Sequence, residues 1–140
     1  MSTNRNAVLE YAADKNWKMA VPCAAAKGTA EEPGCGDTLE VAFAAKRDII
    51  TAIWYNITES ACPPAHACAA AACSLAKGRP VIEAYLITSV DIAGLLSDDG
   101  RLDAEHIHCA MMAELALKRA VRDYSIKKKS AREGERMAVI

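Results

Sequence analysis

Two stretches near the middle of the chain alternate apolar and polar residues with the period of a half-buried β-strand. They cover residues 38–44 and 49–57, and the polar residues 46–48 separate them. A strand, a short polar turn and a second strand predict an antiparallel hairpin. We expect its buried face to carry the apolar residues of the alternation, which are Leu39, Val41, Phe43, Ile49, Ile53, Tyr55 and Ile57.

After residue 60 the apolar spacing becomes helical. Helices are predicted over residues 63–77, 81–87, 89–96 and from 103 to beyond 124. Prolines open the first two of these helices, Gly78 stops the first, and Ser89 or Asp91 is expected to cap the third. The last helix has a buried stripe formed by Ala110, Ala113, Leu117, Val121 and Tyr124.

A hairpin followed only by helices predicts an α+β domain, with helices packed on one face of a small antiparallel sheet. We expect a single domain with three parts. Residues 1–34 form a short helix over residues 5–14 and then an irregular lead-in, residues 35–126 form the core, and residues 127–140 form a polar tail.

The composition and charge of the chain limit the classes of protein to which it could belong. The chain has 140 residues and a formal net charge of -1, which argues against a nucleic-acid binder. No stretch is apolar and long enough to span a bilayer, and residues 1–15 lack the apolar run of a signal peptide. We therefore expect a cytoplasmic protein without a membrane partner. Thiols stay reduced in that compartment, so the six cysteines suggest metal or sulfur chemistry more than disulfides.

Three cysteines lie at junctions between the predicted elements. Cys35 precedes the first strand, Cys62 lies between the second strand and the first helix, and Cys109 lies early in the last helix. A hairpin brings its two ends together, so Cys35 and Cys62 are expected to be neighbours. Thiolates bind zinc and iron–sulfur clusters, and Asp37 and His108 each lie beside a candidate ligand.

The spacing alone leaves other interpretations open. No close pair of cysteines is present, and a single cysteine is often a small buried hydrophobe. Cys68 and Cys73 lie among alanines and are interpreted as core residues, and Cys23 as incidental. His66 could share a helix face with Cys62, but an ordinary surface histidine is favoured. A structural zinc module or a thiol enzyme also remains open at this point.

The sequence resembles the IscU and NifU N-terminal family of scaffold proteins for iron–sulfur cluster assembly. The resemblance runs from about residue 33 to residue 124. Its motifs are Cys35-Gly36-Asp37, Ala61-Cys62, Lys77-Gly78, Asp91-Ile92-Ala93, Ile107-His108-Cys109, Ala113-Glu114 and Arg122-Asp123-Tyr124. Their order, spacing and helical context agree with the family.

The resemblance implies a function that spacing does not show. Such proteins accept sulfur from a cysteine desulfurase, bind iron, assemble a 2Fe-2S cluster and pass it to apo-proteins. By motif position, Cys35, Cys62 and Cys109 look like the cluster thiolates, and Cys109 also like a persulfide acceptor. Asp37 looks like the residue that keeps the cluster labile, and His108 like an accessory ligand. Zinc often fills the site, so a zinc-dependent sulfurtransferase is the alternative to a non-enzymatic scaffold.

Two segments depart from the family pattern. After Cys62 the family has small residues, whereas this chain has Pro63, Pro64 and His66. Each proline removes a backbone donor that could support a cluster. Family members served by a dedicated chaperone carry a Leu-Pro-Pro-Val-Lys segment, and residues 102–106 of this chain differ from it, so docking to such a chaperone is not implied.

Overall fold

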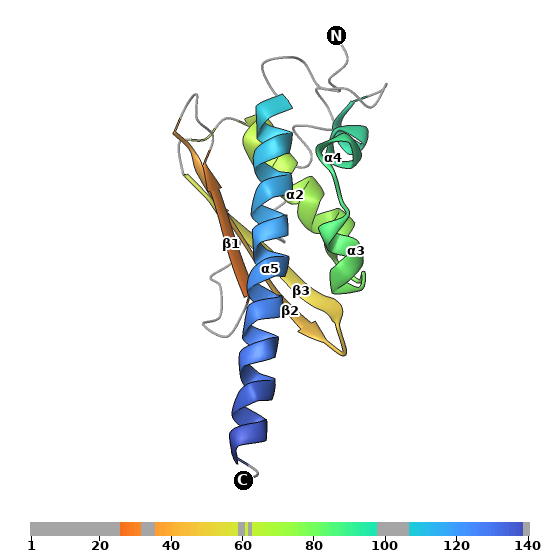
Figure 1. Ribbon diagram of the computed structural model, residues 1–140. Coiled ribbons are helices and arrows are strands. Elements are labelled where there is room, and N and C mark those ends of the chain that lie inside the picture. The colour runs from red at the N-terminus through yellow and green to blue at the C-terminus, as the bar shows by residue number, and fades with distance from the viewer. Residues whose placement is uncertain (1–25, 32–35, 59–60, 62, 98–106, 139–140) are drawn as a thin grey trace.

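The computed structural model describes residues 26–31, 36–58, 61, 63–97 and 107–138, with side chains in the last helix described through residue 129. The predicted helix over residues 5–14 lies outside these ranges. A three-stranded antiparallel sheet has the order β1-β2-β3, formed by Ala26–Glu31, Thr38–Lys46 and Ile49–Ile57 (Figure 1). The predicted hairpin is therefore confirmed as β2 and β3. Its turn residues, Arg47 and Asp48, have φ values of 56° and 62°.

Strand β1 corrects the prediction that the lead-in after residues 5–14 is irregular up to residue 34. It pairs antiparallel with β2, from Ala26 opposite Phe43 to Glu31 opposite Thr38. Its inward positions are the small residues Ala26, Gly28 and Ala30, which have low strand propensity. Their alternation was therefore not recognised in the sequence.

A β-bulge changes which isoleucine of β3 is buried. Ala44 pairs with Ala52 and Ala45 pairs with Ile50, so Thr51 is an extra residue in β3. The Thr51 hydroxyl donates to the carbonyl oxygen of Ala44 at 3.2 Å. Because the bulge reverses the alternation, Ile50 is fully buried and Ile49 is exposed, contrary to the prediction.

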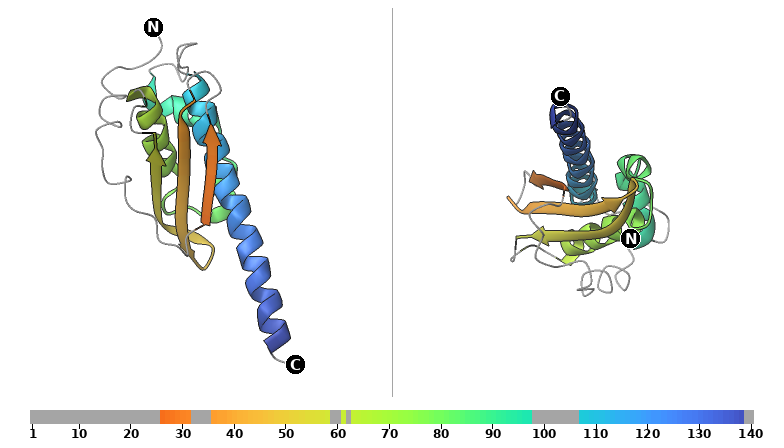
Figure 2. Two further views of the ribbon diagram at one scale, coloured as in Figure 1. Left: turned by 90° about the vertical axis from the view of Figure 1, so that its left-hand side faces the viewer. Right: turned by 90° about the horizontal axis from the view of Figure 1, so that it is seen from below.

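Four helices follow the sheet: α2 (Pro63–Ala76), α3 (Val81–Tyr85), α4 (Ser89–Leu96) and α5 (Ile107–Ala138). Helix α5 lies along β1 and β2, and α2 lies against β3 (Figures 1 and 2). The core residues of all three strands point to this one face, whereas Ala42 and Trp54 lie on the other, and this arrangement confirms the predicted α+β architecture. Helix α5 continues past the hairpin turn, so residues 127–138 are helical.

The helix ends agree with the predictions in part: α3 ends at Tyr85 and not at residue 87, and the predicted start of the last helix near residue 103 lies outside the described residues. Gly78 has a φ of 82° just after α2, as expected for a glycine stop. The N-cap of α4 is Thr88, whose hydroxyl accepts from Asp91 N–H, while Thr88 N–H donates to the Asp91 carboxylate at 2.9 Å. Asp91 is thus the partner in a capping box. The expected cap at Ser89 or Asp91 was therefore wrong by a position or more.

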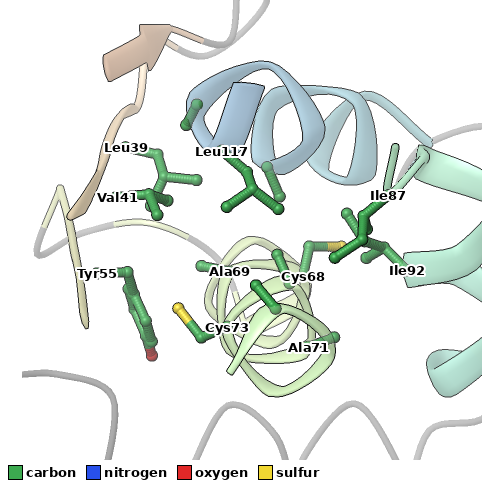
Figure 3. Packing of buried hydrophobic residues seen from close by; sticks show 14 of the residues in the cluster. Leu39, Val41, Tyr55, Cys68, Ala69, Ala71, Cys73, Ile87, Ile92 and Leu117 are labelled. Carbon is green, nitrogen blue, oxygen red and sulfur yellow. The ribbon is translucent and has the colours of Figure 1, made fainter. Parts of the chain in front are cut away.

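The core is built largely from alanine and cysteine between the sheet and the helices. Figure 3 shows Cys68 and Cys73 of α2 pointing into packed apolar side chains, with Cys73 beside Tyr55. Both cysteines are fully buried, and burial raises the pKa of the Cys73 thiol. They behave as small apolar residues of the core, as the sequence suggested.

Candidate functional site

The open ends of β2 and β3 meet at a pair of threonines. Thr38 N–H donates to the Thr58 hydroxyl at 2.8 Å, and Thr58 N–H donates to the Thr38 carbonyl at 3.1 Å. One turn later, Ala61 N–H donates to the Thr58 carbonyl at 2.9 Å. Asp37 and Ala61 therefore flank the same end of the hairpin. These are the residues from which the chain leads toward Cys35 and Cys62.

Gly36 and Asp37 form the entry to β2. Gly36 has a φ of 72°, a left-handed conformation that favours glycine, and no described atom lies within 4 Å of the position of a Cβ. Asp37 is only 8% exposed, although aspartate is normally a surface residue. Asp37 is therefore a buried acidic residue at the open end of the hairpin, and its role as a ligand stays a prediction.

Helix α5 begins with the third predicted ligand. Its first turn holds His108, which is exposed, and Cys109, which is only 5% exposed. The two neighbours therefore face different environments. An exposed imidazole can bind a metal ion or meet a partner, whereas Cys109 lies against the core.

Cys35 and Cys62 lie outside the described residues, so the distances within the full predicted ligand set stay open. Among the residues that the structure does describe, no three His, Cys, Asp or Glu side chains are grouped closely enough to hold a metal ion. Asp37, His108 and Cys109 therefore do not make a metal site by themselves. Any such site at this end of the hairpin needs at least one ligand from outside the described residues.

His66 is packed more closely than the sequence suggested. It is half-buried in α2, and its ring meets Tyr55 edge-on at a centroid distance of 6.4 Å and an interplanar angle of 67°. The favoured interpretation as an ordinary surface histidine is therefore corrected. The aromatic contact directs the imidazole toward β3.

The contacts between β1 and α5 were missed in the sequence because their partners are distant along the chain. A Cβ on Gly28 would lie 2.2 Å from the backbone nitrogen of Ala120, so α5 packs directly on the β1 backbone. Lys27 N–H donates to the Asp123 carboxylate at 2.9 Å, and the Arg119 guanidinium donates to the Thr29 carbonyl at 2.7 Å. The sequence signal for this close packing was Gly28 between Ala26 and Ala30, because a glycine inside a strand often marks a site where another backbone approaches closely.

The environment of Asp123 favours its ionised form. Partial burial raises the pKa of this carboxyl group, but the hydrogen bond from Lys27 N–H and the ammonium group of Lys127, 3.1 Å away, lower it more. Its pKa therefore lies below the ordinary value. Asp123 is charged at neutral pH and accepts strongly from β1.

Comparison with known proteins gives one family. Residues 5–131 match the family described as "NifU-like N terminal domain". The chain is 33% identical over 100 residues to iron sulfur cluster assembly protein 1 of Trachipleistophora hominis, covering 71% of this chain and 68% of the relative. It is 31% identical over 108 residues to the iron-sulfur cluster assembly scaffold protein IscU of Buchnera aphidicola, covering 73% and 77%.

A third relative is a scaffold protein named IscU 1 from Archaeoglobus fulgidus, 34% identical over 97 residues, with 69% of this chain and 60% of the relative covered. Among solved structures, a candidate iron–sulfur cluster assembly scaffold of the SUF system from Fervidobacterium islandicum has a TM-score of 0.70 at 14% identity. That match covers 84% of this chain and 96% of the other. This likeness supports the fold.

No helix among the described residues combines the length and apolar character needed to cross a membrane. The family match includes all five residues that the sequence analysis marked as ligands. The TM-score of 0.70 shows that the structural neighbour has a similar fold. This chain belongs to the family of NifU-like N-terminal domains.

Proposed function

We propose that this chain is a scaffold on which an iron–sulfur cluster is assembled and then passed to an acceptor protein. The family match over residues 5–131, whose relatives are named for iron–sulfur cluster assembly, carries this proposal. The cluster is cargo rather than a resident cofactor. The protein's task is to hold it and then release it.

The proposed ligands are the thiolates of Cys35, Cys62 and Cys109. Asp37 and His108 provide oxygen and nitrogen donors at the same site. Thiolates suit iron–sulfur clusters, whereas a carboxylate is a harder and weaker partner for a cluster iron. An acceptor thiolate can displace a ligand that binds iron weakly. We therefore assign the lability of the cluster to Asp37.

Sulfur is proposed to arrive as a persulfide from a cysteine desulfurase. The Cys109 thiolate attacks the outer sulfur of the donor persulfide, the donor S–S bond breaks, and the donor leaves as a thiolate. This step conserves electrons. Conversion of the transferred sulfur into cluster sulfide then requires a separate reductant. The 2Fe-2S form is the cluster that we propose for this site, and apo-proteins are the proposed acceptors.

The test is reconstitution of the anaerobic apo-protein with ferrous iron, cysteine and a desulfurase, followed by visible spectroscopy. Growth of iron–sulfide charge-transfer bands supports the scaffold. The bands should disappear in Cys109→Ser. They should persist in Cys68→Ala and Cys73→Ala, because both of those thiols are buried in α2.

A zinc-dependent persulfide relay on the same fold is the second candidate. Cysteine, histidine and aspartate are also zinc ligands, and His108 is exposed beside Cys109. Under this alternative, reconstitution gives a persulfide on Cys109 and retained zinc, without charge-transfer bands.

A further inference from the structure

The loop between α2 and α3 is held against the turn of the hairpin by backbone hydrogen bonds. Gly78 N–H donates to the Ile50 carbonyl at 2.9 Å, and Ile50 N–H donates to the Arg79 carbonyl at the same distance. Val81 N–H donates to the Asp48 carbonyl at 2.8 Å. The loop and the turn therefore form one surface at the closed end of the hairpin.

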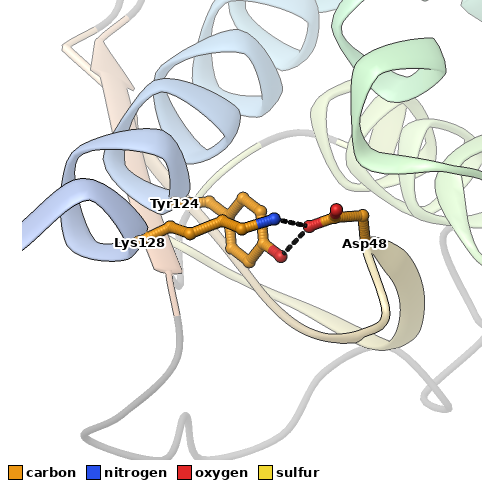
Figure 4. Close-up of polar contacts among 3 residues, drawn as sticks. All are labelled: Asp48, Tyr124 and Lys128. Atoms are coloured by element: carbon orange, nitrogen blue, oxygen red, sulfur yellow. Dashed lines mark hydrogen bonds and ion pairs between the residues drawn. The ribbon is translucent and has the colours of Figure 1, made fainter. Parts of the chain in front are cut away.

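Helix α5 passes the same turn. In Figure 4, the Asp48 carboxylate accepts from the Tyr124 hydroxyl at 2.6 Å and from the Lys128 ammonium group at 2.5 Å. The residues on both sides of Lys128 are also lysines. Three segments that are distant in the sequence thus meet at the closed end.

These segments bring basic side chains together in a surface that we call the basic end. It consists of Lys46, Arg47, Lys77, Arg79, Lys127, Lys128 and Lys129, of which Lys128 is half-buried and the others are exposed. Three described carboxylates lie beside it, those of Asp48, Asp123 and Glu83. The basic groups outnumber them, although the whole chain has a formal net charge of -1. Such an uneven distribution of charge attracts an anionic partner to one end of a molecule.

An apolar hollow of about 260 Å³ opens between the turn, α3 and α5. Its lining includes Pro80, Val81, Ile82 and Val121, with Ser125 and Lys128 beside them. Ile82 is 69% exposed, so apolar surface is accessible there. Apolar side chains seated in such pockets are typical anchors of protein interfaces.

The shape of this surface favours a protein partner over other anionic partners. A bilayer takes up apolar side chains that protrude from a protein, whereas a hollow receives a side chain from its partner. Nucleic acids meet basic surfaces mainly through phosphates and need no apolar hollow. A second copy placed symmetrically would bring like charges together.

We propose that the basic end is a docking surface for an acidic segment of a partner protein. The segment places its carboxylates against the lysines and arginines and inserts one apolar side chain into the hollow. It lies at the opposite end of the sheet from Thr38 and Thr58, so the open end of the hairpin stays accessible. This inference is independent of the proposed function.

The probe is a fluorescein-labelled peptide, Asp-Glu-Asp-Leu-Phe-Glu-Asp-Glu, and its binding to the full chain is measured by fluorescence anisotropy. Binding should weaken as the salt concentration rises, because salt screens exposed charges. Arg47→Glu combined with Arg79→Glu should raise Kd about tenfold or more, because two attractive pairs become repulsive.

Arg119→Glu is the matched control for charge, since it makes the same exchange at another exposed arginine. The Arg119 guanidinium donates to the Thr29 carbonyl at 2.7 Å, and Thr29 pairs with Glu40. Glu40 lies six residues before Lys46 in β2, which is about 20 Å from the turn. This variant should keep Kd within about twofold of wild type, because salt screens charges at that distance.

Ser125 provides a matched pair of variants for the hollow. It is exposed and lines the hollow, so Ser125→Phe fills part of the space and should raise Kd about tenfold, the worth of one buried apolar side chain. Ser125→Ala leaves the space open and should bind as wild type does. Thermal unfolding checks that each variant is folded. Arg47→Gln with Arg79→Gln replaces the glutamate pair if that pair does not fold.

Several results would overturn the inference. These are a wild-type chain that does not bind the acidic peptide at millimolar concentration, or one that binds a version with lysines for all acidic residues equally well. Unchanged affinity in the Arg47 and Arg79 variants or in Ser125→Phe would do the same. Tighter binding of a single-stranded oligonucleotide, or of vesicles made of phosphatidylcholine and phosphatidylserine, would assign the basic end to a different partner. Sedimentation that shows a dimer abolished by Arg47→Glu would assign it to a second copy.

Discussion

At the scale of single residues, Gly28 is the described glycine whose surroundings leave the least room for a side chain. A Cβ there would meet the backbone of Ala116, Arg119 and Ala120 at 2.2–2.6 Å. Backbone atoms of a helix cannot move aside as a flexible side chain can. The closeness of α5 to β1 therefore depends on the absence of a side chain.

Gly28→Ala should lower the free energy of unfolding by about 3 kcal/mol or more, the upper range for overpacking. Gly94→Ala is the matched control, because Gly94 lies inside α4 and a Cβ there meets no described atom within 4 Å. That control should stabilise the chain by up to about 1 kcal/mol through helix propensity. Urea unfolding of both variants checks this. Similar stability of the two would contradict the close packing.

Asp37 is the residue on which cluster lability is proposed to depend. Asp37→Ala should give a cluster that survives severalfold longer in the presence of a chelator, because the weak oxygen position is removed. The decay of visible absorbance measures this. Glu31→Ala is the control, since Glu31 is an exposed carboxylate at the same end of the sheet, opposite Thr38. Equal lifetimes in wild type and Asp37→Ala would remove Asp37 from that role.

At the scale of elements, the attachment of β1 to α5 should depend on pH. The pKa of Asp123 is lowered in the folded chain, so its contribution to stability is complete above the ordinary aspartate pKa. It is lost as the pH falls through the lowered value. The side chain is 32% exposed, so the effect is modest.

Hydrogen exchange of the β1 amides across this acidic range should show wild type converging on Asp123→Asn as the pH falls. At neutral pH the two should differ most. A constant difference between them at all pH values would mean that the Asp123 charge does not hold β1.

The capping box of α4 gives a second test at this scale. Thr88→Ala removes the hydroxyl that accepts from Asp91 N–H and should lower the free energy of unfolding by about 1 kcal/mol. Thr88→Ser keeps the acceptor and should retain most of the stability. Thermal unfolding of both variants measures the difference. Equal losses of stability in Thr88→Ala and Thr88→Ser would show that the hydroxyl contributes little.

At the scale of the whole molecule, α5 joins the two ends of the sheet. Its first turn carries Cys109, its middle holds β1, and Tyr124 and Lys128 reach the hairpin turn at Asp48. A single rigid element thus links the proposed ligand to the rest of the fold.

The sequence predicted the parts of this fold that depend on local pattern. The alternation of large apolar residues identified β2 and β3, and the glycine stop and apolar stripe identified α2 and α5. Strand β1 was missed because the nearby α5 requires small residues there, and small residues give no strand signal. The contacts of Lys27 with Asp123 and of Thr29 with Arg119 join distant positions, which no local pattern reports.

The candidate site was predicted from motifs more than from physics. The family match covers the positions of Cys35, Cys62 and Cys109, and the structure adds a buried Asp37 and an exposed His108 at the ends of their elements. Their roles as ligands stay a proposal. Bare spacing could not have distinguished cluster ligands from buried thiols such as Cys68.

The most direct test measures iron and acid-labile sulfide per chain after anaerobic reconstitution, in wild type and in Cys35→Ser, Cys62→Ser and Cys109→Ser. Cys73→Ala is the control. The scaffold proposal predicts that wild type and the control each bind as much sulfide as iron. Each serine variant should lose most of both. Retention of iron and sulfide in all three serine variants, or uptake of zinc alone by wild type, would contradict it.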